Sequence, residues 1–394
     1  MMRHKLIPFA IACFIGMLLA LLYHWHQSVY GMQVIYLTQP LPDNNDVYYL
    51  KWLNQQDLHR TEITDVENFY YVKNKTYHLE SDELVKKISV LCLIISKSSK
   101  RVKAINSTWV KHCNHHFFVG NFPKNLITTL KVIKTSGQTN FEVMCSVIHD
   151  ITKDVQNYNW ILIVEDKAFA IVENLRYFVA SYSSKDIHYF GHAVKDDFSG
   201  ISYNLASAGI VLSSGAASYL HHSTPPNCKT NISNYMYDMA LGEILGRAHV
   251  HPIDTRDHHG RCRFNSFNME TALAPGGTDL SSPYWKQSLY LSYTGRSCCS
   301  DSAVTFNNVA IKKMFFTYYL IYKIHPMRTG SGVGNIKKSD KINSKTSSKN
   351  IQKPGNLSVD LIDDDEGGTK INKGFVSLVH KKSKKKEPKN DKKA

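Results

Sequence analysis

The chain has 394 residues, of which 43% are hydrophobic and 11% aromatic, so it can bury a substantial globular core. Lysine and arginine outnumber the acids by 48 to 33, a net charge of +15, but much of this excess follows Arg328. A Lys-rich end of this composition is typical of a solvated, disordered tail. We therefore predict a disordered tail over residues 328–394 and expect no nucleic-acid partner.

The N-terminal region contains one apolar run. Leu6 to Tyr23 is uncharged and spans about 18 residues, close to the roughly 20 that a helix needs to cross a bilayer. Arg3 and Lys5 precede the run, so residues 1–5 are predicted to be cytosolic and the rest lumenal. A cleavable signal peptide is the alternative, but no small-residue cleavage site precedes Tyr23. The sequence predicts a single-pass type II protein of the Golgi or endoplasmic reticulum membrane.

Lumenal placement decides how the cysteines and the glycosylation motifs are interpreted. Disulfides persist in the oxidising secretory pathway, and no pair of cysteines has the spacing of a zinc site. The disulfide candidates are Cys92, Cys113, Cys228, Cys298 and Cys299. The potential N-glycosylation sites are Asn74, Asn106, Asn231 and Asn356.

The elements follow a polar segment, residues 24–86, that shows no sustained period and is predicted to be a stem. From residue 87 to 327, short β-branched runs alternate with segments of helical spacing. The expected strands are 88–95, 116–119, 160–164, 188–190 and 209–212, the expected helices are 102–111, 141–155 and 171–181, and residues 314–322 form a terminal helix or strand. This alternation predicts an α/β domain with a mainly parallel central sheet and flanking helices.

Two acids, Glu165 and Asp166, come directly after the expected strand that ends at Val164. Ligands of open α/β sheets bind outside the carboxyl ends of the strands, so acids at this place can hold a hard cation. An ion that bridges two phosphates needs only one or two protein carboxylates. A pair of surface acids in a turn is the alternative.

A longer set of segments, in order between Ile88 and Pro326, resembles the T-synthase (core 1 β1,3-galactosyltransferase) family. The segments are Thr108 to Cys113, Trp160 to Lys167 with Glu173 to Leu175, Tyr189 to Gly191, Ala208 to Ser213, Asp238 to Gly242, Asp254 to Asp257, and Cys298 to Phe306. The resemblance implies a GT-A fold in glycosyltransferase family 31, with Mn²⁺ as cofactor. It also implies transfer of galactose from UDP-galactose to the 3-hydroxyl of GalNAc on Ser or Thr of glycoproteins.

The resemblance assigns roles to individual residues. Asp238 matches the base that takes the acceptor proton, although an acid near a helix start is also favoured by the exposed N–H groups. Glu165, Asp166 and Lys167 match the donor-diphosphate site, with Glu165 and Asp166 as metal ligands. The acceptor side matches Arg256 and Asp257, while Trp285 and Tyr293 supply either an aromatic surface for a sugar or plain packing.

The chain departs from the family pattern at three positions. Lys167 replaces a third carboxylate, Asn307 stands where a metal-binding His is expected, and Asn106 replaces a basic residue while beginning a glycosylation motif. An ammonium cannot bind a cation, and Asn is a weak ligand for a transition metal. These changes resemble the dedicated chaperone of T-synthase, whereas the segments at Asp238 and Asp254 are closer to the enzyme.

Three functional hypotheses follow. The first is a divergent galactosyltransferase with Asp238 as base. The second is a catalytically silent paralogue that assists an active T-synthase relative, so a heterodimer is expected in addition to the homodimer that an enzyme could form. The third is a membrane-tethered lectin-like domain that keeps the acceptor pocket alone.

Overall fold

The computed structural model describes residues 13–23, 25, 39–61, 78–134, 139–229, 235–274, 276, 283–324 and 335–338, which lie within the compact unit 1–341. Its longer helices are α2 (Asn45–Gln55), α4 (Glu80–Lys87), α5 (Ser99–Asn106), α7 (Asn140–Ile151), α8 (Val172–Val179), α9 (Ser214–Ser223), α10 (Tyr237–Arg247) and α13 (Ile311–Tyr322). The short ones are α6 (Lys124–Ile127), α11 (Met269–Leu273), α12 (Pro283–Lys286), η1 (Trp109–His112), η2 (Thr152–Asn157), η3 (Ala206–Ala208) and η4 (Gly295–Ser297).

A six-stranded sheet forms the centre, in the order β5-β4-β3-β6-β11-β8. Its strands are β3 (Val90–Ile95), β4 (His115–Val119), β5 (Val132–Ile133), β6 (Trp160–Glu165), β8 (Tyr189–Gly191) and β11 (Ile210–Ser213). The pairs β5–β4, β4–β3 and β3–β6 are parallel, whereas β11 is antiparallel to both of its neighbours. The prediction of a mainly parallel sheet is confirmed, with β11 as the reversed strand.

The remaining strands form smaller sheets beside the central one. Strands β12 (Phe264–Asn265), β13 (Thr305–Phe306) and β7 (Phe169–Ala170) form one, and β9 (Ala193–Lys195) with β10 (Ser202–Asn204) forms a hairpin-like pair. Strands β1 (Leu58–Thr61), β14 (Asn335–Lys338) and β2 (His78–Leu79) form the third.

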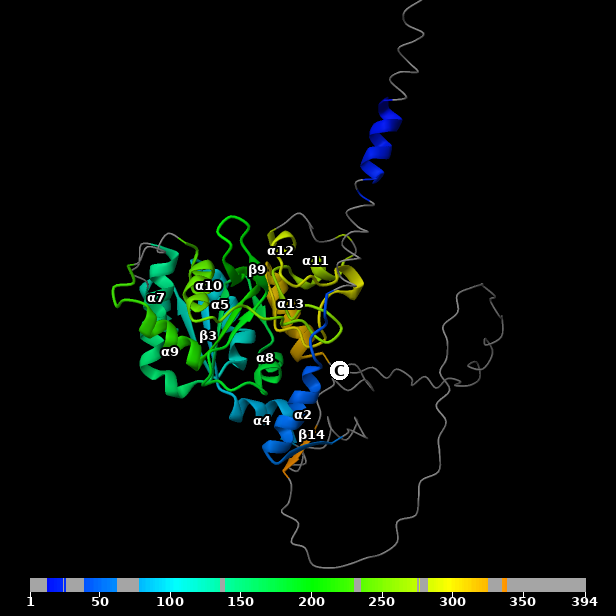
Figure 1. The fold of residues 1–394 in the computed structure, drawn as a ribbon. Coiled ribbons are helices and arrows are strands. Elements are labelled where there is room, and N and C mark those ends of the chain that lie inside the picture. Colours follow the sequence, from blue (N-terminus) through cyan, green and yellow to red (C-terminus); the bar gives the residue numbers. More distant parts are fainter. Residues whose placement is uncertain are drawn as a thin grey trace, which may run out of the picture. The chain divides into compact units, whose positions relative to one another are not determined.

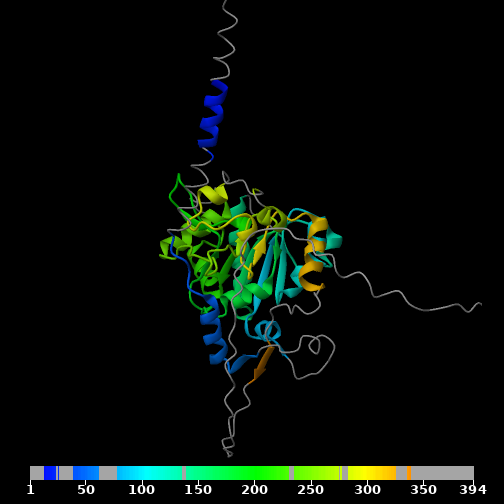
Figure 2. The ribbon, with the colours of Figure 1, turned by 90° about the vertical axis from the view of Figure 1, so that its right-hand side faces the viewer.

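Both faces of the central sheet are covered, because alternate residues of its strands point into two separate cores. From β3, Val90 and Cys92 join a core with α5, α8 and α13, while Leu91 and Leu93 join another with α7, α9 and α10. Figure 1 shows α7, α9 and α10 grouped on one side, and Figure 2 shows α13, in orange, beside the strands. A continuous apolar run is the expected pattern for a strand buried on both faces.

The segment predicted to be a stem differs from that prediction where the structure describes it. Residues 45–61 form α2 and β1, and Tyr49, Leu53 and Leu58 are buried in the core that contains α5 and α8. The sequence lacked a visible period because only a narrow face of α2 is buried, at Asn45, Tyr49 and Leu53. These residues therefore belong to the folded domain.

The other expected elements form with shifted ends. The helix expected over 102–111 divides into α5 and the 3₁₀ turn η1, and the one expected over 141–155 becomes α7 followed by η2. The Tyr/Phe-rich segment at 314–322 is helical, within α13. Helix ends are the least predictable part of an element, since caps and not hydrophobic period decide them.

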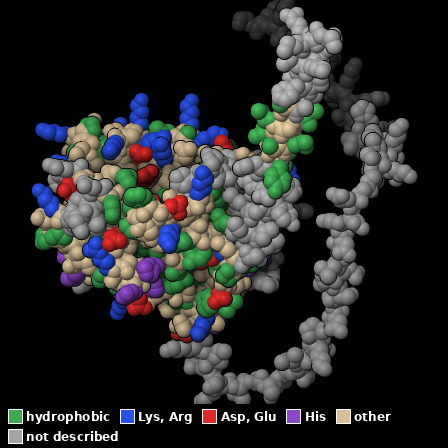
Figure 3. Space-filling model, turned by 45° about the horizontal axis from the view of Figure 1, so that its top comes forward, with side chains coloured by type: hydrophobic (Ala, Val, Ile, Leu, Met, Phe, Trp, Pro, Cys, Tyr) green, Lys and Arg blue, Asp and Glu red, His purple; other side chains and the backbone are tan. Residues whose placement is uncertain are grey.

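The predicted membrane-spanning run and the predicted tail are each described only in part. Of the apolar run 6–23, residues 13–23 are helical, and no helix among the described residues is both long and apolar enough to span a bilayer. The predicted tail, 328–394, lies outside the described residues except for β14. On the face shown in Figure 3, basic side chains of the described residues are dispersed among acidic and neutral ones.

Candidate functional site at the carboxyl end of the sheet

Strands β3 and β6 are parallel and end side by side, with Ile95 paired to Glu165. The next residue of each strand, Ser96 and Asp166, therefore meets the other, and the Ser96 hydroxyl donates to Asp166 Oδ2 at 2.6 Å. Arg101, in α5, brings its Nε to 3.8 Å from Asp166 Oδ1. Asp166 thus has a hydroxyl and a guanidinium as partners.

Glu165 lies among other polar groups. Burial raises the pKa of its carboxyl, the negative charges of Asp238 and Asp166 raise it further, and Lys167 and a hydrogen bond from Asn307 oppose that rise. Asn307 follows β13 and is buried, with 5% of its surface exposed. Its Oδ1 has no hydrogen-bond partner in the described part of the chain. We call Glu165, Asp166, Asp238 and Asn307 the carboxyl-end cluster.

Asp238 lies in the first turn of α10 and is 7% exposed. Its Oδ2 accepts the Ala206 N–H and its Oδ1 accepts the Met239 N–H, both at 2.9 Å. Burial raises the pKa of the carboxyl, and these backbone donors oppose the rise. The residue therefore ties the helix start to η3, as the capping alternative expects, while its basicity is raised, as a general base requires.

Lys167 is exposed, and its backbone C=O accepts the Val309 N–H at 2.9 Å. The Val309 C=O in turn accepts from Arg101 Nη1 at 3.1 Å. The Lys167 backbone and the Arg101 guanidinium are therefore both bonded to the same residue, Val309, at the border of the cluster.

Arg256 and Asp257, which were predicted to face the acceptor, are buried and form ion pairs and hydrogen bonds within the protein. Arg256 is 4% exposed, forms an ion pair with Asp254 at 2.7 Å, and donates to the C=O groups of Leu291 and Pro40. Asp257 is also buried and accepts from Arg261 Nε at 2.8 Å. We call residues 254–261 the ion-pair loop.

Trp285 does not provide an exposed aromatic surface. It is 3% exposed and packs beside Tyr284 and Phe267 in the core, so the packing alternative describes it. Tyr293 is half-buried.

Three disulfides join the cysteines of the described domain. They are Cys92–Cys113, Cys145–Cys228 and Cys298–Cys299, which pairs all five candidates and adds Cys145. Cys145 was missed because its helical spacing in α7 is that of an ordinary core residue. Cys262 is a buried thiol that accepts the Ser292 hydroxyl at 2.9 Å.

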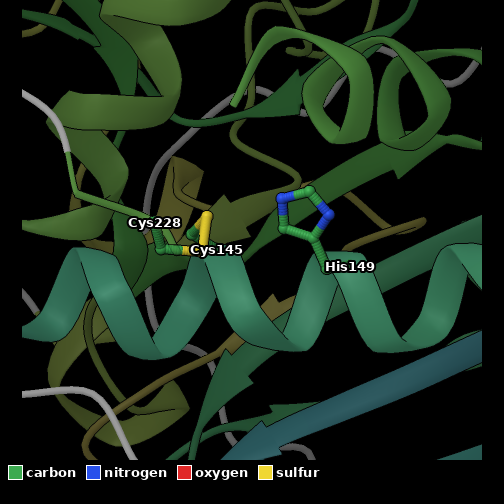
Figure 4. Close-up of side chains that lie close together, drawn as sticks. All are labelled: Cys145, His149 and Cys228. Atoms are coloured by element: carbon green, nitrogen blue, oxygen red, sulfur yellow. A yellow bond between two sulfur atoms is a disulfide. The ribbon is translucent and has the colours of Figure 1, made fainter. Parts of the chain in front are cut away.

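Cys145, His149 and Cys228 place their sulfur and nitrogen atoms within 4.8 Å of one another. Figure 4 shows the two sulfurs joined, with the His149 ring beside them on α7. A metal needs deprotonated thiols, and the disulfide leaves none here. The group is therefore a structural crosslink in this oxidised state.

Two cavities of the described residues are lined by none of the residues of the carboxyl-end cluster. One of about 350 Å³ lies between the β9–β10 pair and α10, and another of about 220 Å³ is bordered by Trp52, Trp160 and Tyr182. Neither is lined by the residues that the sequence assigned to donor or acceptor. Among the glycosylation motifs, Asn106 ends α5 and is half-buried, whereas Asn74, Asn231 and Asn356 lie outside the described residues.

The donor set at the carboxyl end does not fit Mn²⁺. Asp166 already has Arg101 beside it, Lys167 replaces the third acid, and Asn307 offers only an amide oxygen. Mn²⁺ accepts carboxylate and carbonyl oxygens, so the amide of Asn307 does not by itself exclude it, but two positive side chains beside only two carboxylates oppose the binding of a divalent cation.

Ser96 and Arg101 were not selected from the sequence. A signal was present, since Ser96 to Arg101 is rich in Ser, Lys and Arg directly after a buried strand. These residues follow the carboxyl end of β3, just as Glu165 lies at the carboxyl end of the parallel strand β6, where ligands of such sheets bind.

Comparisons with known proteins agree with part of this picture. The chain is 28% identical over 251 residues to glycoprotein-N-acetylgalactosamine 3-beta-galactosyltransferase 1 of Xenopus laevis, covering 62% of this chain and 69% of the relative. No family model matches the chain. The solved structure of 4-diphosphocytidyl-2C-methyl-D-erythritol synthase aligns with 42% of this chain and 86% of its own at 13% identity, but its TM-score of 0.27 supports no conclusion. The similarity to the Xenopus protein supports a relationship to T-synthase-like galactosyltransferases and is consistent with a glycosyltransferase.

Proposed function

We propose that this chain is a membrane-anchored glycosyltransferase of the Golgi or endoplasmic reticulum that transfers galactose from UDP-galactose to the 3-hydroxyl of GalNAc on Ser or Thr of glycoproteins. The observation that carries the proposal is the carboxyl-end cluster, in which Asp238 of α10 lies within electrostatic range of Glu165 at the end of β6, beside Asp166, although the two segments are far apart in the sequence. The similarity to the Xenopus galactosyltransferase supports the substrate class.

In the proposed reaction, the acceptor 3-hydroxyl oxygen attacks the anomeric carbon of galactose. The new C–O bond forms as the bond from that carbon to the diphosphate breaks, and the electron pair of the broken bond leaves with UDP. The hydroxyl proton passes to the Asp238 carboxylate. Burial raises the pKa of this carboxyl, which makes it a stronger base than a surface aspartate.

The test is transfer of labelled galactose from UDP-galactose to a GalNAc-threonine peptide by the full chain in detergent. Asp238→Asn keeps the shape of the side chain but removes the base, so we expect transfer to fall by about 10²–10⁴-fold. Circular dichroism and thermal melting of the variant verify that α10 still folds. Equal activity in the folded variant would exclude Asp238 as the base.

A catalytically silent paralogue that assists an active relative is the second candidate. It is favoured by the contacts that already occupy Asp166 and Asp238, since Arg101, Ser96 and two backbone N–H groups use their oxygens. It predicts no transfer from folded protein and co-purification with a co-expressed T-synthase. A GalNAc peptide bound without any effect of UDP would instead favour the lectin-like hypothesis.

A further inference from the structure

The carboxyl-end cluster has positive charge built into its border. Arg101 and Lys167 come from different elements, α5 and the turn after β6, yet both are held by Val309. The Val309 N–H bonds to the Lys167 C=O, and the Val309 C=O accepts from Arg101 Nη1. The backbone at Lys167 and the guanidinium of Arg101 are thus fixed relative to each other.

The two side chains differ in how far they are engaged. The Arg101 side chain is 21% exposed, and its Nε lies 3.8 Å from Asp166, a distance that leaves the guanidinium free to share its charge. Lys167 is exposed and forms no ion pair with any described residue, although its charge is felt by Glu165. An ammonium on a flexible stem beside a fixed guanidinium is a pair suited to phosphate oxygens.

We infer that this chain binds the diphosphate of a nucleoside-diphosphate sugar without a divalent cation, with Lys167 and Arg101 supplying the positive charge. Two unit charges equal the charge of one divalent ion, and they occupy the border of the cluster that is unsuited to Mn²⁺. The inference rests on the proposed function, because it assigns the donor site of that reaction. It explains why a lysine is compatible with a position where a carboxylate would be needed to hold a metal.

The experiment measures UDP binding to the full chain in detergent by isothermal titration calorimetry, with EDTA and separately with MnCl₂. We expect similar affinities in the two conditions. Lys167→Met is expected to weaken UDP binding about tenfold in EDTA, since one charge next to the diphosphate is lost. The matched control is Lys51→Met, which removes an exposed lysine of α2 and is expected to leave the affinity unchanged.

Lys167→Asp sharpens the test, because it adds a third carboxylate in place of the cation. Its UDP binding is expected to be weak in EDTA and to recover with MnCl₂. Melting curves of each variant confirm that it is folded before binding is compared.

The outcomes separate this inference from the proposed function. UDP binding by the unmodified chain that disappears in EDTA and returns with MnCl₂ would overturn the inference but leave the transfer reaction intact. Cation-independent UDP binding without galactose transfer would support the inference and contradict the enzyme. No UDP binding in either condition overturns both.

Discussion

The carboxyl-end cluster and the ion-pair loop both bury acidic side chains, but they treat the charges in opposite ways. In the ion-pair loop, Asp254 and Asp257 each have an arginine at 2.7–2.8 Å. In the cluster, Glu165 and Asp238 interact electrostatically, and the guanidinium of Arg101 lies 3.8 Å from Asp166. A buried acid paired with arginine depends on its partner, whose removal destabilises the fold, whereas buried acids gathered without full compensation indicate a binding or catalytic site.

The pKa values express the same difference. Burial alone would raise the pKa of Asp257, but the Arg261 N–H, Ser300 and the Arg261 guanidinium outweigh it, and the pKa lies below its usual range. The pKa values of Glu165 and Asp238 lie above theirs, with burial as the main cause. The family resemblance assigned both the ion-pair loop and the carboxyl-end cluster to substrate binding. Their contacts differ, since the acids of the loop are paired with arginines and those of the cluster are not fully paired.

The largest expected effect on stability comes from breaking the ion-pair loop at Arg256. Arg256→Met leaves Asp254 without its partner and removes the bonds to Leu291 and Pro40, so the free energy of unfolding should fall by about 3 kcal/mol. Urea denaturation followed by circular dichroism measures this. The control is Arg247→Met, which breaks an exposed pair with Glu243 on α10 and should cost under about 0.5 kcal/mol. Equal losses in the two variants would refute a structural role for Arg256.

A smaller and pH-dependent effect is expected at Arg261. Arg261→Met should lower the free energy of unfolding by about 1 kcal/mol at pH 7, because Arg261 is partly exposed and its second partner, Asp301, is largely in solvent. The pKa of Asp257 is depressed in the folded state, so the stability it provides is present above about pH 3.9 and lost as the pH falls through the folded value. Melting curves from pH 2 to 7 should therefore converge for variant and parent at the acid end. A constant difference across this range contradicts the assignment.

The smallest effect, and of opposite sign, is expected in the carboxyl-end cluster. Glu165→Gln removes a buried negative charge near Asp238 and Asp166, so the melting temperature at pH 7.5 should rise by a few degrees. The pKa of Glu165 is raised on folding, so the folded state is favoured below the unfolded value of about 4.3 and loses that advantage as the pH rises through the folded value. The gain of the variant should accordingly disappear near pH 4. The melting temperatures of the variant and the parent, compared in EDTA, measure this gain. A variant that melts below the parent at pH 7.5 would show that the Glu165 charge is compensated in the folded protein.

Much of the fold was predictable from the sequence. The sequence segments of β3, β6 and β11 are continuously apolar because both faces of each strand are buried. Segments with helical spacing of apolar residues lie between several of the strands, and this alternation predicts a mainly parallel sheet. The place of Glu165 and Asp166 at a strand end also followed, since a strand that is recognised fixes where its carboxyl end lies. These are local patterns, and each depends on residues within one element.

Tertiary structure decided what those residues touch. Arg101 contacts Asp166, which is 65 positions away, and Cys145 is joined to Cys228 across 83 positions. Arg256 pairs with the neighbouring Asp254 but also donates to the distant Leu291 and Pro40. The burial of α2 likewise depends on a surface provided by α8. The sequence by itself determined which side chains stand at the ends of the strands. Only the folded chain decided which charges are paired, because pairing depends on distances between elements that no local pattern encodes.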